Sequence, residues 1–108
     1  MPDGNDRDST RLSFVLNGKE ETLYFRHPEG TFRMTPAGRV SLEAIAGHSS
    51  LLKGNGIDWG CGVGCLSVAA AKLDALRKIY GLDISGENTI LSINNSGTNR
   101  VSEKGAFF

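Results

Sequence analysis

The stretch that decides the fold is Ile57-Asp58-Trp59-Gly60-Cys61-Gly62-Val63-Gly64. An apolar residue leads into an acid, and glycines follow at three alternate positions. Glycine allows backbone conformations and close approaches that a Cβ atom would prevent. The pattern predicts a short buried strand over 56–59 that ends in a tight turn, with a bare backbone against which a ligand can lie.

A second acid, Asp83, ends another apolar run in the sequence. We expect a strand over 56–59, a helix over 65–73 and a second strand over 78–83. A strand, a crossover helix and a strand of these lengths form a right-handed parallel unit. Two acids and a glycine turn at this separation are typical of a unit that binds a nucleoside.

The sequence after Asp83 predicts another helix and the start of another strand. The helix begins at Ser85 or Gly86 and runs through Ile93, with Ile90, Leu91 and Ile93 as its apolar set. Residues 94–105 read as polar turns, and Ala106-Phe107-Phe108 as the first residues of a third strand. Parallel sheets usually have both faces covered. We therefore expect residues 50–108 to be the N-terminal part of a larger, truncated domain with an open sheet edge.

Two segments are expected ahead of this domain. Residues 1–11 are polar and predicted to be a disordered tail, whereas residues 12–49 are predicted to form a hairpin and a helix. Thr35 and Pro36 are typical of a helix start, and Gly47 of a helix end. A loop is expected over 27–34. The helix's expected apolar set is Ala37, Val40, Ala44 and Ile45.

Two registers are open to the hairpin. A two-residue loop would set Phe14 opposite Glu21, and a four-residue loop would set Phe14 opposite Leu23 and Leu12 opposite Phe25. We favour the four-residue loop because it pairs apolar side chains across one face. That face is expected to pack against a missing part of the domain.

Composition excludes several classes of protein. The 108 residues contain 12 basic and 12 acidic side chains, so no basic surface for nucleic acid is indicated, although a nucleic-acid substrate stays open. No apolar run approaches the roughly 20 residues that span a bilayer, and the polar start has no signal core. An intracellular, cytoplasmic protein without a membrane partner is therefore expected.

The cysteines and histidines indicate no metal site. Cys61 and Cys65 are interpreted as small residues beside a tight turn in a reducing compartment. His27 and His48 have no ligand spacing to them and are expected at the surface.

The acid before the turn discriminates between two ligands. A carboxylate from Asp58 would repel a pyrophosphate and favour a ligand that carries an ammonium and a sulfonium. A dinucleotide turn has glycine or alanine three residues after Gly62, where this chain has Cys65. Asp83 fits either ligand, because both present a ribose diol. S-adenosylmethionine is therefore favoured, and an NAD(P)-dependent oxidoreductase stays as the alternative.

The two motifs together carry a resemblance to a family. The glycine stretch, followed by Tyr80-Gly81-Leu82-Asp83-Ile84-Ser85, resembles the first two motifs of class I S-adenosylmethionine-dependent methyltransferases. The residues of the two motifs most resemble those of small-domain methyltransferases, which act on RNA or protein. The resemblance implies an α/β, Rossmann-like parallel sheet. It assigns these residues to the cofactor: Asp58, Trp59, Gly60, Cys61, Gly62, Gly64, Asp83 and Ile84.

The resemblance also implies individual roles. Asp58 would orient the methionine ammonium, the glycines would line methionine and ribose, Asp83 would accept from the ribose hydroxyls, and Ile84 would flank the adenine. Trp59 either stacks on a ligand or packs on the sheet's other face, which the strand alternation favours.

The implied activity is methyl transfer to a nitrogen of RNA or protein. The residues that hold the acceptor are expected downstream of Phe108, so no catalytic residue is assigned. A second alternative to this activity is a truncated, non-catalytic chain. Such a chain would bind the cofactor, or would pair its open sheet edge with a partner.

Overall fold

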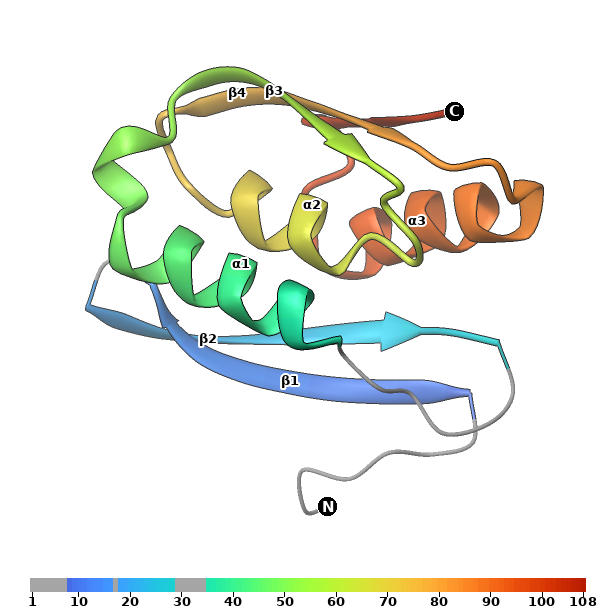
Figure 1. Cartoon of the computed structure of the whole chain (residues 1–108), viewed down its shortest axis with the longest axis horizontal. Coiled ribbons are helices and arrows are strands. Elements are labelled where there is room, and N and C mark those ends of the chain that lie inside the picture. Colours follow the sequence, from blue (N-terminus) through green and yellow to red (C-terminus); the bar gives the residue numbers. More distant parts are fainter. Residues whose placement is uncertain (1–7, 17, 29–34) are drawn as a thin grey trace.

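A computed structural model of the chain describes residues 8–16, 18–28 and 35–108. The chain forms an α/β structure in which a layer of helices lies between a hairpin and a second sheet (Figure 1). The elements in chain order are β1 (Ser9–Leu16), β2 (Lys19–Arg26), α1 (Pro36–Gly47), a 3-10 turn (Ser49–Leu51), β3 (Gly54–Trp59), α2 (Cys65–Ala71), β4 (Leu76–Leu82), α3 (Gly86–Thr98) and β5 (Gly105–Phe107).

The second sheet confirms the predicted parallel unit and the third strand. Its order is β3-β4-β5, and both pairs are parallel. Asp58 pairs with Gly81 and Trp59 with Leu82, so the carboxyl ends of β3 and β4 meet at the same edge. That edge is where ligands bind in open α/β sheets.

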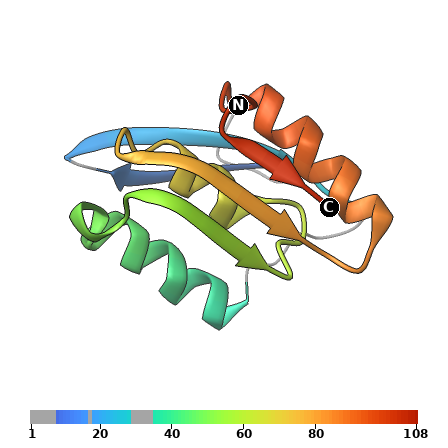
Figure 2. The same cartoon turned by 90° about the horizontal axis from the view of Figure 1, so that it is seen from above.

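The three helices all lie on one side of this sheet (Figures 1 and 2). The helix α2 supplies the small residues that allow close packing, since Val68 and Ala69 are completely buried. Residues of β3 that point the other way are exposed, with Ile57 at 61% and Trp59 at 77%. The sheet is therefore covered on its helix side alone within the described part of the chain.

The predicted register of the hairpin is wrong. Leu12 pairs with Leu23 and Phe14 with Glu21, as the two-residue loop requires. Gly18 has φ +75°, which suits the tight turns of two-residue hairpins. The two registers differ by two residues and so place the same side chains on the inner face. Apolar pairing across the strands therefore could not distinguish the two registers. The tight turn at Gly18 determines the register that forms.

The inner face of the hairpin is packed within the chain itself, and not left for a missing part as expected. Leu16, Leu23 and Phe25 are at most 3% exposed and share one core with residues of α1 and α2. The strand also begins at Ser9. Residues 9–11 are thus ordered in a strand, contrary to the prediction of disorder, and residues 1–7 lie outside the described residues.

The start and end of α1 are confirmed. Thr35 Oγ1 accepts from Gly38 N at 3.0 Å, and the helix ends at Gly47. The apolar set is wrong in part, because Ile45 packs against the core as expected, whereas Val40 is 66% exposed and the buried residue is Leu42. The large side chain of Leu42 is the one that reaches the core below the hairpin.

The largest correction concerns α3. Its predicted start is confirmed, since Ser85 Oγ accepts from Asn88 N. The helix runs to Thr98, through residues that were expected to be turns. Ile90 and Ile93 are 62% and 51% exposed, and its buried residues are polar: Ser92, Asn95 and Ser96.

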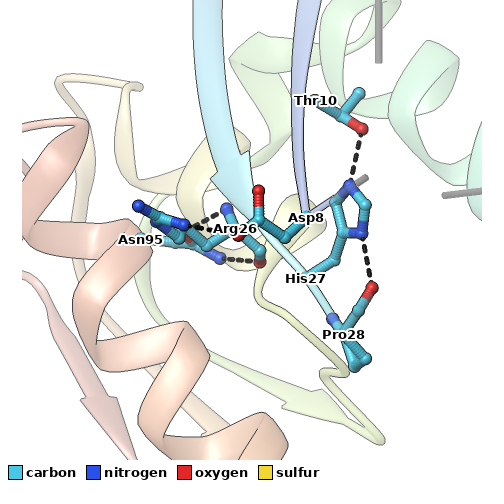
Figure 3. Close-up of polar contacts among 6 residues, drawn as sticks. All are labelled: Asp8, Thr10, Arg26, His27, Pro28 and Asn95. Atoms are coloured by element: carbon cyan, nitrogen blue, oxygen red, sulfur yellow. Dashed lines mark hydrogen bonds and ion pairs between the residues drawn. The ribbon is translucent and has the colours of Figure 1, made fainter. Parts of the chain in front are cut away.

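His27 is buried rather than at the surface. It is 5% exposed, and its ring lies between Thr10 Oγ1 and the carbonyl of Pro28, each at 2.9 Å (Figure 3). Beside it, Arg26 pairs with Asp8 at 2.9 Å. His48 is exposed at the end of α1, as expected. The rest of the expected loop, residues 29–34, lies outside the described residues.

Candidate functional site

The turn between β3 and α2, residues 60–64, is called the glycine loop below. Gly60, Gly62 and Gly64 have φ of +68°, +58° and +93°, a region that favours glycine. A Cβ atom at Gly60 or Gly62 would meet nothing within 4 Å, whereas one at Gly64 would lie 3.1 Å from Ser92 Oγ. The first two glycines therefore leave open space, and the third allows α3 to approach.

The amides of the glycine loop are tied to the end of β4. Gly60 N and Cys61 N both donate to the carbonyl of Leu82, at 2.7 and 2.9 Å. Gly62 N donates to Asp83 Oδ2 at 2.9 Å. The loop is thus fixed against the neighbouring strand, at the edge that the sheet topology offers to a ligand.

The carboxylate of Asp83 connects the loop to the start of α3. Asp83 Oδ1 accepts from Ser85 N at 2.9 Å and from Asn88 Nδ2 at 3.3 Å, while Oδ2 accepts from Gly62 N. These bonds, with that from Ser85 N the strongest, lower the pKa of Asp83 below its ordinary value. A fixed negative charge therefore stands beside the open backbone of Gly62 at neutral pH.

Asp58 points from β3 toward the helices. Its Oδ2 accepts from the hydroxyl of Ser67 at 2.6 Å, and Ser67 is 1% exposed in α2. Asp58 also lines an open and mainly apolar cavity of about 220 Å³ beside Gly56 and Leu66. The acid is therefore oriented by α2 rather than acting as a cap of that helix.

Both cysteines are neutral thiols. Burial raises the pKa of Cys61, and burial raises the pKa of Cys65 to about 12. The sulfur of Cys61 lies 3.8 Å from the carbonyl of Gly62 and 3.7 Å from Ser92 Oγ, beneath the loop. Within the described residues, no group of three potential ligands could hold a metal ion.

Trp59 and Ile84 are the two large apolar side chains among the predicted site residues, and both are exposed. Trp59 alternates with Asp58 and lies on the sheet face away from the helices. Ile84 follows Asp83 and is fully exposed. The structure thus brings Gly60, Gly62 and Asp83 together and leaves Trp59 on the opposite face.

Two contacts of the loop were missed from the sequence. Ser92 Oγ donates to the carbonyl of Gly62, and Asn95 Nδ2 donates to the carbonyl of Val63, both at 2.8 Å. The available signal was the helical spacing of small polar residues at 92, 95 and 99, which a longer predicted helix would have placed on one face.

None of the described helices has the length and apolar character to span a bilayer.

Comparison with known proteins identifies the family. A family model described as Ribosomal protein L11 methyltransferase (PrmA) matches residues 34–107, which is more than half of the chain. The ribosomal protein L11 methyltransferase of Photobacterium profundum is 40% identical over 73 residues, or 68% of this chain and 24% of that relative. The chain spans about a quarter of the length of the curated relatives that it matches.

Solved structures show the same fold. Arabidopsis thaliana protein arginine methyltransferase 10 matches with a TM-score of 0.59 and 17% identity over 65% of this chain and 20% of that one. A complex of aTrm5 with tRNALeu matches with a TM-score of 0.58 and 23% identity over 95% of this chain and 28% of that one. The wider match extends to the hairpin, which therefore has a counterpart in a larger protein.

The matched region contains the glycine loop, the parallel sheet and α1 to α3. These findings confirm the Rossmann-like fold and the resemblance to methyltransferases. The chain belongs to the ribosomal protein L11 methyltransferase family.

Proposed function

We propose that this chain forms the S-adenosylmethionine-binding part of a methyltransferase that acts on a protein nitrogen. The observation that carries the proposal is the ionised carboxylate of Asp83, bonded to Gly62 N at the carboxyl end of β4. A carboxylate that accepts hydrogen bonds beside a turn without side chains suits a ligand that carries a ribose diol. Family membership supports methyl transfer as the chemistry.

The residues at this edge fit the cofactor. Open space beside Gly60 and Gly62 leaves room for a ligand to lie on the backbone. Asp83 Oδ1 accepts two bonds and Oδ2 one, while a carboxylate offers about four acceptor sites. Oδ2 therefore keeps capacity for a hydroxyl donor.

The proposed task of the chain is orientation. When bound, S-adenosylmethionine supplies a methyl group already activated on a sulfonium. Asp83 accepts from the ribose hydroxyls, Asp58 attracts the cationic end of the ligand, and the exposed Ile84 covers the adenine. Holding the ligand in one position gives an acceptor nitrogen a defined line of attack. No catalytic residue is assigned within the chain.

A protein acceptor is favoured over RNA. The relatives are named as methyltransferases of a ribosomal protein, and the chain has a net charge of zero. Binding to nucleic acid usually requires a basic surface. A cytoplasmic location, where ribosomal proteins are made, belongs to the same proposal.

Calorimetric titration of the 108-residue chain tests the proposed ligand. We expect S-adenosylmethionine and S-adenosylhomocysteine to bind and NAD⁺ not to bind. Asp83→Asn should weaken binding by roughly ten-fold or more, because it removes a charge-assisted acceptor. Asp58→Asn should weaken binding by a smaller factor.

Asp74→Asn is the matched control, since Asp74 is an exposed carboxylate in the turn before β4. It should bind as the wild-type chain does. Binding of NAD⁺ without binding of S-adenosylhomocysteine would overturn the proposal in favour of an oxidoreductase. Methylation of RNA but not of ribosomal protein by the protein would overturn the choice of acceptor.

A further inference from the structure

A row of buried polar side chains, here called the α3 polar row, lies on the inner face of α3 and at its C-terminal cap: Ser92 and Asn95 in the helix and Asn99 at the cap. They are 0%, 1% and 4% exposed. Each finds hydrogen-bond partners, as buried polar groups must. The row faces the hairpin on one side and the glycine loop on the other.

The two asparagines clamp the edge of β2. Asn95 Oδ1 accepts from Arg26 N at 2.8 Å, and its Nδ2 donates to Arg26 O at 3.0 Å (Figure 3). Asn99 makes the same pair of bonds with Tyr24, at 2.9 and 2.8 Å. Tyr24 and Arg26 are alternate residues, so the two amides bond to β2 as a neighbouring strand would.

The two asparagines differ in the acceptor to which the second proton of the side-chain amide is donated. Asn95 Nδ2 also donates to Val63 O in the glycine loop, at 2.8 Å. Asn99 Nδ2 donates instead to Asn95 O in α3, the helix that Asn99 caps, at 2.8 Å. Asn95 alone of this pair therefore joins the hairpin to the loop.

Ser92 completes the contact with the loop. Its hydroxyl donates to Gly62 O, so α3 holds two successive carbonyls, those of Gly62 and Val63. On the other side of the loop, the amide of Gly62 is held by Asp83. The peptide groups on either side of Gly62 are thus fixed in direction from two elements.

We propose that Ser92 and Asn95 are positioning residues for the glycine loop, and that Asn95 couples the docking of the hairpin to the conformation of the loop. Ser92 and Asn95 turn the two carbonyls toward α3 and leave the opposite side of the loop open to a ligand. The effect on ligand affinity rests on the proposed function, whereas the effect on the loop does not.

The test compares Asn95→Ala with Asn99→Ala. Both variants lose the bonds to β2 and should lose similar stability to urea. Only Asn95→Ala also removes a bond to the glycine loop. In the ligand-free chain, we expect the Gly62 and Gly64 amides to exchange with solvent about ten-fold faster in Asn95→Ala, measured by NMR, and within two-fold of wild type in Asn99→Ala.

Affinity for S-adenosylhomocysteine is then measured where circular dichroism shows each variant fully folded. We expect about ten-fold weaker binding for Asn95→Ala and a change within two-fold for Asn99→Ala. Equal effects of the two variants on exchange and on affinity would overturn the proposal, since α3 would then act on the loop through stability alone.

A second pair keeps the test decisive if Asn95→Ala does not fold. Ser92→Ala loses the bond to the loop, whereas Ser96→Ala, 2% exposed, loses a bond to Ile93 O within α3. Faster exchange at Gly62 is expected in Ser92→Ala alone, and equal exchange in both would overturn the proposal. If amide exchange differed between the paired variants but the chain bound no S-adenosyl ligand, the positioning role of Ser92 and Asn95 would stand and the proposed function would be rejected.

Discussion

The helices α2 and α3 flank the same loop and bury opposite chemistries. In α2, Val68 and the following alanines pack into the shared core, through contacts that have no preferred direction. In α3, Asn95 and Asn99 bond to named backbone atoms of β2 and the glycine loop. Apolar packing of this kind gives strength, and directed bonds give position. We therefore infer that α2 mainly stabilises the fold, whereas α3 mainly fixes the conformation of the glycine loop.

The largest effect is expected from a charge placed in α2. Val68 is 0% exposed, so Val68→Asp would bury an unpaired carboxylate and cost about 3–5 kcal/mol of unfolding free energy. Urea denaturation followed by circular dichroism measures it. Val40→Asp is the control, because Val40 is 66% exposed in α1, and it should change stability by about 0.5 kcal/mol or less. Similar losses in the two variants would contradict the burial of Val68 in the shared core.

A smaller loss is expected from the polar side of the comparison. Asn99→Ala leaves the amide and carbonyl of Tyr24 without their partners, which should cost about 2 kcal/mol. The same urea titration applies, with the exposed Asn94→Ala as control. A loss no greater than that of Asn94→Ala would show that the asparagine clamp carries no stability.

The hydroxyl of Ser67 in α2 donates to Asp58, and its removal tests whether α2 also stabilises the fold through a directed bond. Ser67→Ala removes a 2.6 Å bond to a half-buried carboxylate and should cost about 1–2 kcal/mol. Ser50→Ala, at an exposed position of the 3-10 turn, should be neutral in the same assay. Neutral behaviour of both would mean that α2 stabilises the fold by apolar packing alone.

The smallest effect concerns the pH dependence of stability. The pKa of Asp83 is lowered in the folded chain, chiefly by the amide of Ser85, so its contribution is present above the ordinary Asp pKa of about 4. That contribution is lost as pH falls through the folded value. Urea midpoints of wild type and Asp83→Asn should differ at pH 7 and converge toward pH 3. A difference between the two urea midpoints that grows as the pH falls would contradict a lowered pKa of Asp83 in the folded chain.

Much of the fold could be predicted because its signals are local. The glycine turn after Asp58, the alanines of α2 and the start of α1 at Thr35 each involve residues near one another in sequence. Asp83 could be located for the same reason, as the acid that ends a predicted strand. These positions contain the proposed cofactor site almost completely.

The missed features depend on partners that are distant in sequence. Asn95 bonds to Arg26 across 69 residues and Asn99 to Tyr24 across 75, so apolar periodicity could not reveal why polar residues are buried there. His27 is buried because Thr10 lies beside it in the paired strand. The hairpin register was missed because apolar pairing was given more weight than the turn at Gly18.

The central claim is that an S-adenosyl ligand lies on the glycine loop beside Asp83. Titration of the ¹⁵N-labelled chain with S-adenosylhomocysteine, followed by amide chemical shifts, tests it most directly. The account predicts that the largest shifts occur at Gly60, Gly62 and Asp83, with little change on the hairpin strand β1. Saturable shifts confined to other parts of the chain, or none at millimolar ligand, would contradict it.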